Sequence, residues 1–249
     1  MKLLLIRHAE PDYTVDSLTP KGWVEAELLA KRLLRLPLGD LYQSPRGRAM
    51  DTARLYLRLS GKSIETLPWL EEFRARTKDP ETGKPRICWD LKPRLWQAHP
   101  MLMSVETWDS DPLYAGSDTT QIWHETTDGV DALLARYGFY KDGPVWKCAE
   151  NTEQTIACFC HFGIAMVIMG YMMNLSPVVL WQTMIMAPSS VTLLETEERV
   201  KGEVVWRCSK LGDLTHLEAA GEPWSTAGMY PELYTGIDST DPRKNGTLR

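Results

Sequence analysis

The sequence predicts an α/β fold, a three-layer sandwich in which a mainly parallel central sheet is flanked by helices. Two observations predict it. Residues 2–7 and 154–160 are short, almost continuous apolar runs that end in polar residues, which is typical of strands buried on both faces of a parallel sheet. Strand and amphipathic helix patterns alternate over residues 2–67, and this order indicates parallel strands joined by crossover helices.

The first part of the chain contains the clearest alternation. Thr19 and Pro20 provide an N-cap and a proline in the first turn, and apolar residues at helical spacing predict a crossover helix of about 16 residues after them. A second strand, a second helix and a third strand are predicted at residues 40–43, 46–59 and 64–67.

The rest of the chain begins with a break in this pattern. Residues 73–116 are rich in proline and tryptophan and have no long period, so we interpret them as a cap insertion over the carboxyl ends of the strands. The elements expected after it are a helix at 117–137, the strand 154–160, helices at 163–173 and 177–183, and antiparallel strands at 191–196 and 204–208. Residues 212–249 are expected to form an irregular tail of the same single domain, which spans 1–249.

The composition excludes several classes of protein. A formal charge of −5 argues against a nucleic-acid partner, which needs a basic excess. The most apolar later window, 159–173, is shorter than the roughly 20 residues of a membrane span. Five cysteines at scattered spacings do not resemble a disulfide framework. We therefore expect a soluble cytoplasmic protein with no membrane partner; its oligomeric state does not follow from the sequence.

Charged and titratable residues follow several of the predicted strands. Arg7 and His8 follow the first strand, and His161 follows the strand 154–160. Arg48 lies in the first turn of the second helix, where backbone N–H groups and a guanidinium both favour an anion. Glu72 follows the third strand. Because ligands of open α/β sheets bind at the carboxyl ends of strands, these side chains are expected to converge on one site.

Four short motifs carry a resemblance to a known family. The sequence resembles the histidine phosphatase superfamily, the phosphoglycerate mutase-like group. Its Arg-His-Gly motif is similar to Arg7-His8-Ala9, and its Ser-Pro-x-x-Arg-Ala-x-x-Thr-Ala motif matches Ser44 to Ala53 position for position. The acid motif is similar to Leu70-Glu71-Glu72, and the late His-Gly element to His161-Phe162-Gly163.

The resemblance implies a mechanism. His8 would be the nucleophile and form a phosphohistidine, Arg7, Arg48 and His161 would bind the phosphoryl oxygens, and Glu72 would be the general acid. Glu71 competes with Glu72, because spacing alone does not separate two adjacent carboxylates. Thr14 occupies the position of a family asparagine and keeps a hydroxyl donor for phosphate, and the backbone N–H of Phe162 can point at the same group. No metal or cofactor is expected.

Three functions are compatible with these residues. A phosphatase that hydrolyses a small phosphorylated metabolite is favoured, since the extended substrate motifs of the phosphoglycerate mutases do not occur around the acid. A mutase that returns the phosphoryl group to a second hydroxyl of the same substrate needs the same side chains. A non-catalytic module that binds a phosphorylated ligand would keep Arg7 and Arg48 and lose the nucleophile or the acid.

Overall fold

The computed structural model describes residues 1–236, and its centre is an eight-stranded mixed sheet. The strand order is β5-β4-β10-β1-β11-β12-β9-β8. The first four strands are parallel: β5 (Glu65–Thr66), β4 (Leu38–Gln43), β10 (Thr155–Cys160) and β1 (Lys2–Arg7). The other four pair antiparallel: β11 (Val191–Val200), β12 (Glu203–Asp213), β9 (Val145–Cys148) and β8 (Phe139–Asp142).

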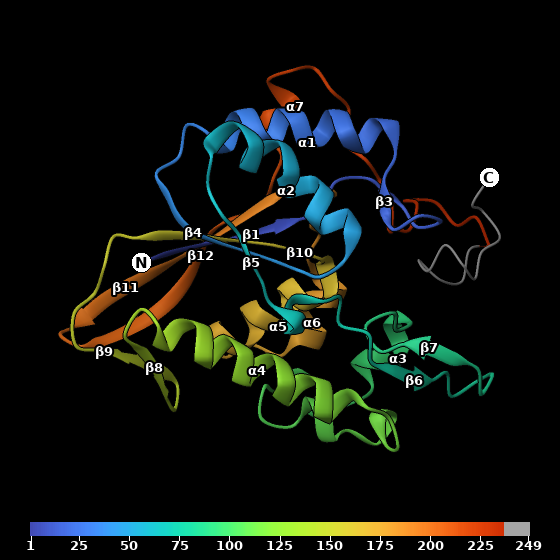
Figure 1. Ribbon diagram of the computed structural model, residues 1–249. Helices are drawn as coiled ribbons and strands as arrows, with labels where there is room; N and C mark the ends of the chain where they lie inside the picture. Colours follow the sequence, from blue (N-terminus) through green and yellow to red (C-terminus); the bar gives the residue numbers. More distant parts are fainter. Residues whose placement is uncertain (237–249) are drawn as a thin grey trace.

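Helices cover both faces of the sheet and make the three layers (Figure 1). One face carries α1 (Pro20–Leu33), α2 (Gly47–Ser60) and the short α7 (Thr215–Glu218). The other carries α4 (Thr119–Ala135), α5 (Phe162–Met173) and α6 (Pro177–Thr183). The side chains of β1 alternate between these layers, so Leu4 and Ile6 join the core cluster of α1 and α2, whereas Leu3 and Leu5 join that of α5. The predicted α/β sandwich is confirmed.

The predicted helix starts have a clear physical basis. The side chain of Thr19 accepts a hydrogen bond from the N–H of Gly22 at the start of α1, and Pro20 occupies the first turn. The hydroxyl of Ser176 caps α6 in the same way by accepting from the N–H of Val178. Both caps satisfy N–H groups that the helix itself leaves without an acceptor.

Helix α5 is apolar around its circumference, and it is buried accordingly. Residues such as Ala165, Met166 and Val167 are fully buried between the sheet and α6.

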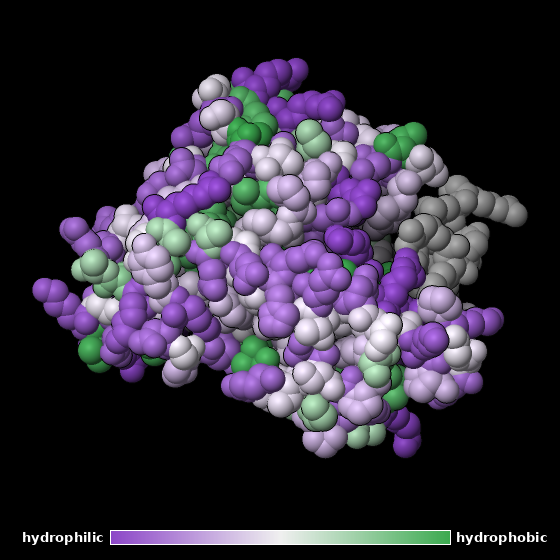
Figure 2. All heavy atoms as spheres, turned by 60° about the horizontal axis from the view of Figure 1, so that its bottom comes forward, coloured by the Kyte–Doolittle hydropathy of each residue, from purple (hydrophilic) through white to green (hydrophobic). Residues whose placement is uncertain are grey.

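No helix among residues 1–236 is long and apolar enough to cross a membrane. On the face seen in Figure 2, hydrophilic side chains dominate and hydrophobic ones appear as small separate groups.

The segment predicted as an insertion, 73–116, contains only short elements. It holds the hairpin of β6 (Arg76–Lys78) and β7 (Pro85–Ile87), the short helix α3 (Pro93–Gln97) and three turns of 3₁₀ helix at Pro100–Met103, Trp108–Ser110 and Pro112–Tyr114. A further turn of this type, Pro68–Leu70, precedes it. Trp108 is fully buried and its ring contacts those of Phe73, Tyr114, Trp123 and Trp181. This aromatic cluster packs the insertion onto α4 and α6.

Some elements differ from those predicted. The third strand is shorter than residues 64–67, and the hairpin β8–β9 was not predicted from the sequence. Residues 212–213 end β12 and residues 215–218 form α7. The first residues of the predicted irregular tail therefore have regular secondary structure. Residues 237–249 of the predicted tail lie outside the described residues. A small hairpin of β2 (Pro11–Asp12) and β3 (Ser17–Leu18) connects β1 to α1.

Candidate active site

The two strand-end histidines lie side by side, as the parallel pairing of their strands requires. Arg7 of β1 is in register with Cys160 of β10, and the N–H of His8 donates to the carbonyl of Cys160 at 3.0 Å. The rings of His8 and His161 are 5.1 Å apart between centroids and are tilted by 58°. Both rings are buried, with 2% and 0% of each residue exposed.

The hydrogen bond of His8 determines where its lone pair lies. Its Nδ1 is 2.8 Å from the carbonyl oxygen of Ala9, and a carbonyl oxygen only accepts, so Nδ1 carries the hydrogen. Burial, and then the charges of Arg7 and Arg48, lower the pKa of His8 well below its ordinary value. The imidazole is therefore neutral at physiological pH with the lone pair on Nε2, which is the form that can act as a nucleophile.

His161 has one partner and one unpartnered nitrogen. Its Nε2 is 2.7 Å from the hydroxyl of Ser44, which also accepts a hydrogen bond from the N–H of Arg46. Its Nδ1 is buried and has no hydrogen-bond partner within residues 1–236. Burial, followed by the charge of Arg48, lowers the pKa of His161 well below its ordinary value, so this ring is also neutral.

Two arginines lie beside these rings. Arg7 is buried and donates from Nη1 to the carbonyl of Met186 at 2.5 Å and from Nη2 to that of Ala227 at 3.2 Å. Arg48, in the first turn of α2, donates from Nη1 to Asp16 at 2.6 Å. In the described part of the chain, the Nε of each arginine is buried without a hydrogen-bond partner.

These three nitrogens indicate a ligand. A buried polar group without a partner costs about 1–3 kcal/mol, so native structures rarely leave several together. Arg7 Nε, Arg48 Nε and His161 Nδ1 belong to residues that surround His8, and two of them carry positive charge. When the Ser44 hydroxyl donates to His161 Nε2, the hydrogen of the neutral ring is on Nδ1, and all three nitrogens are then donors. An anion with several acceptor oxygens, such as phosphate, would satisfy them.

The carboxyl group of Glu72 is held by backbone N–H groups, one of them in the first turn of α5. Its Oε1 accepts from the N–H of Phe73 at 2.9 Å and from that of Ile164 at 3.0 Å. Burial raises the pKa of Glu72, although Arg48 and the two N–H donors oppose the shift. Within residues 1–236 both hydrogen bonds to this carboxyl end on Oε1, so Oε2 is the oxygen that remains to carry a proton. Glu71 instead forms an ion pair with Arg46. The geometry favours Glu72 over Glu71 as the acid.

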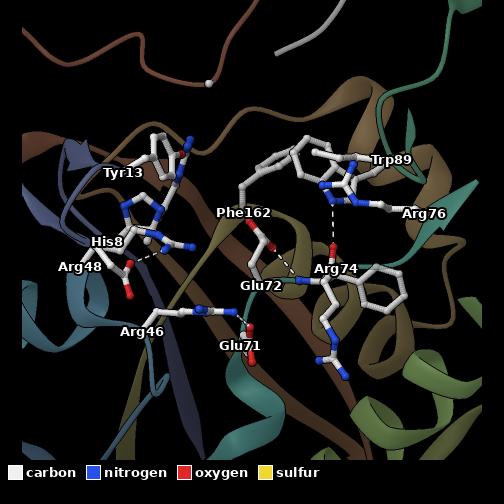
Figure 3. Close-up of a pocket in the computed structure, with 15 residues that line it drawn as sticks. His8, Tyr13, Arg46, Arg48, Glu71, Glu72, Arg74, Arg76, Trp89 and Phe162 are labelled. Carbon is white, nitrogen blue, oxygen red and sulfur yellow. Dashed lines mark hydrogen bonds and ion pairs between the residues drawn. The ribbon is translucent and has the colours of Figure 1, made fainter. Parts of the chain in front are cut away.

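Arg7, His8, Arg48 and Glu72 line a cavity of about 350 Å³ at the carboxyl ends of the parallel strands (Figure 3). His161 is fully buried behind His8 and is not among the described lining residues. The described lining consists of Arg7, His8, Tyr13, Asp16, Arg46, Arg48, Glu71, Glu72, Phe73, Arg74, Arg76, Ile87, Trp89, Phe162 and Gly228. Five are arginines and three are acidic, so the cavity attracts anions. Within residues 1–236, no three His, Cys, Asp or Glu side chains are grouped in a way that would hold a metal ion.

The remaining predicted residues have different surroundings. Phe162 lines the cavity, with its ring against Trp89 and 5.9 Å from the guanidinium of Arg7. Thr14 is exposed and outside the lining; its N–H and hydroxyl both donate to Asp12. The lining includes instead Tyr13 and Asp16, which the sequence reasoning missed. No motif points to them, because a loop conformation decides which of its side chains turn inward.

Gly163 allows Glu72 to approach α5. A Cβ at this position would lie 2.7 Å from Glu72 Oε1 and 2.8 Å from the Nε1 of Trp89. We predict that Gly163→Ala displaces the Glu72 carboxyl and lowers kcat/KM by about 10- to 100-fold, because misplacement of a catalytic group is costly. Steady-state kinetics of Gly163→Ala, Glu72→Gln and the double variant test this prediction. Fully additive losses in the double variant would contradict it, since they would mean that Gly163 acts independently of Glu72.

Fold and site together define an α/β protein with an arginine-rich pocket beside His8 at the carboxyl ends of its parallel strands. Residues 3–82 match the model of the histidine phosphatase superfamily (branch 1), and the predicted resemblance to this superfamily is confirmed. This segment includes Arg7, His8, Arg48 and Glu72, whereas His161 lies beyond it.

Part of the sequence and the fold resemble those of named proteins. A putative phosphoserine phosphatase 2 of Hydrogenobacter thermophilus is 41% identical over 61 residues, and this match spans only 21% of the chain and 30% of the relative. A mutant phosphoserine phosphatase of Entamoeba histolytica, solved with phosphoserine, has a TM-score of 0.58 at 17% identity over 87% of this chain and 98% of its own. A mycobacterial glucosyl-3-phosphoglycerate phosphatase has a TM-score of 0.56 at 19% identity, over 85% and 98%. These structures share the fold.

Proposed function

We propose that the protein is a phosphatase that hydrolyses a small phosphorylated metabolite through a phosphohistidine on His8. One observation carries the proposal: within residues 1–236, three buried nitrogens without hydrogen-bond partners, two of them arginine Nε donors, belong to residues beside a neutral histidine whose Nε2 holds the lone pair. The donors match the oxygens of a phosphoryl group and the lone pair matches the nucleophile that attacks it. The matched superfamily and the phosphatase names of the relatives support the same activity.

In the first step, the substrate's phosphoryl oxygens bind Arg7, Arg48 and His161. The Nε2 lone pair of His8 forms a bond to phosphorus while the ester P–O bond breaks. The Nδ1–H that donates to Ala9 stabilises the positive charge that develops on the ring. Protonated Glu72 gives its proton to the leaving oxygen, which departs as an alcohol.

In the second step, water attacks the phosphorus of the phosphohistidine. Glu72, now a carboxylate, takes a proton from this water, and the N–P bond breaks. The electron pair of that bond returns to Nε2, and inorganic phosphate leaves. Glu72 is protonated again, so the enzyme is ready for another cycle.

The class of substrate and the cellular compartment are part of the same proposal. The arginine-rich cavity supports a small phosphorylated substrate, and two relatives are named for phosphoserine and for glucosyl-3-phosphoglycerate. All five cysteines are free thiols, which supports the reducing cytoplasm as the location.

A screen of phosphorylated metabolites in chelator-treated buffer tests the activity. The panel includes phosphoserine and 3-phosphoglycerate, and each reaction is analysed for inorganic phosphate and for isomers of the substrate. We expect phosphate release from at least one compound. An isomer formed without phosphate release would make the protein a mutase, and binding of phosphate compounds without any turnover would make it a binding module.

A further inference from the structure

The loop that joins β1 to α1 holds Arg48 from two sides. The ring of Tyr13 lies over the guanidinium, with its centroid 5.5 Å from the central carbon, and Asp16 accepts a hydrogen bond from Nη1 at the edge. Arg48 is therefore clamped on its face by an aromatic ring and on its edge by a carboxylate.

This loop is itself fixed to the start of α2. The second oxygen of Asp16 accepts from the N–H of Gly47 at 2.9 Å, and the hydroxyl of Ser17 donates to Asp51 in the same helix. A Cβ on Gly47 would lie 2.1 Å from the carbonyl oxygen of Asp16, so only glycine admits the loop here. Asp16 has a φ of 49°, a left-handed conformation that aspartate tolerates better than most residues. Asp16 thus bridges the helix backbone and the arginine.

The carboxylate of Asp16 has two opposite effects on a bound phosphate. It repels the phosphate charge, and it also fixes the arginine that binds phosphate. The repulsion is weakened by solvent, because 40% of the Asp16 side chain is exposed. The hydrogen bond to Asp16 uses Nη1, and Nε is buried and unpartnered among the described residues, so the guanidinium keeps donors for phosphate. A long side chain that is already fixed loses less conformational entropy on binding.

We propose that Asp16 is a positioning residue that presets the Arg48 guanidinium for the phosphoryl group. The inference rests on the proposed function, because it assumes that Arg48 binds phosphate. In this proposal Asp16 acts through Arg48 and through the N–H of Gly47, and it takes no part in the chemical steps.

The test compares Asp16→Ala, Asp16→Asn and the matched control Asp12→Asn. Among residues 1–236, the Asp12 carboxylate accepts hydrogen bonds from Thr14 alone, and Asp12 is not one of the described lining residues. Calorimetric titration with inorganic phosphate gives the Kd of each protein, and steady-state kinetics gives KM. We expect Asp16→Ala to raise Kd and KM about 10-fold, a value typical of losing one charge-assisted hydrogen bond. Asp16→Asn should have a smaller effect, because its amide oxygen still accepts from one donor, and Asp12→Asn should match the wild type.

A second comparison separates positioning from general loop damage. In an Arg48→Ala background, Asp16→Ala should not weaken phosphate binding further, whereas a collapsed loop would still do so. Tighter phosphate binding by Asp16→Ala would overturn the proposal and make Asp16 a competing anion. An unchanged Kd would also overturn it. The phosphatase proposal is tested separately. A wild-type protein that binds phosphate but neither forms phosphohistidine nor releases phosphate would refute catalysis. The comparison of phosphate Kd values among the Asp16 variants would still test the positioning role.

Discussion

Replacement of His8 by asparagine is expected to abolish turnover, with kcat reduced on the order of 10⁴- to 10⁶-fold, as for other enzymes that lose their nucleophile. The amide has no lone pair that can form the bond to phosphorus. With a ³²P-labelled ester, rapidly quenched wild-type protein should carry acid-labile, base-stable label, and the His8→Asn protein should carry none. Phosphate binding should largely persist, because Arg7, Arg48 and His161 remain.

The matched control is His124→Asn, since His124 is exposed on α4 and takes no part in the cavity. It should label and turn over like the wild type. Residual activity of the His8→Asn protein above one per cent of the wild type, with label retained, would show that another residue forms the intermediate.

Replacement of Glu72 by glutamine is expected to have the next largest effect. The amide oxygen still accepts from Phe73 and Ile164, but the proton donor is lost. For an alkyl phosphate, whose leaving group needs a proton, kcat/KM should fall by about 10²- to 10⁴-fold. With p-nitrophenyl phosphate the first step needs no acid, so the variant should accumulate phosphohistidine because the water-activating base is missing. Chemical quench and steady-state assays on both substrates measure this difference.

The pH profile and the neighbouring residue provide the controls. A general acid with a raised pKa keeps its proton to higher pH, so kcat/KM for alkyl phosphates should fall as the pH rises through the pKa of Glu72, and Glu72→Gln should lose this limb. His8 has a lowered pKa, so it should stay unprotonated, and active, at pH values below its ordinary pKa.

Glu71→Gln should lower kcat/KM much less than Glu72→Gln does. A large loss in Glu71→Gln with an active Glu72→Gln would assign the acid to Glu71.

The elements that could be predicted from the sequence are those with a strong local pattern. The strands β1 and β10 and the helix α5 are continuous apolar runs, and α1 and α2 have apolar residues at helical spacing. The caps at Thr19 and Ser176 likewise act within a few positions. The hairpin β8–β9 consists of two four-residue strands joined by a tight turn, and a run this short has too little alternation to predict a strand. Its pairing with β12 depends on contacts far away in the chain.

By itself, the sequence determined the α/β class, the alternation of its first elements and the placement of Arg7, His8, Arg48 and His161 at strand ends and a helix start. These features follow from local patterns and from the rule that parallel strands present their carboxyl ends at one edge. Only the tertiary structure decided which loop residues enter the cavity. Thr14 turns outward whereas Tyr13 and Asp16 turn inward, because the loop rests against Gly47. The structure also gives the two glutamates different surroundings: within residues 1–236, Glu72 accepts from the N–H of Ile164 in α5, whereas Glu71 pairs with Arg46.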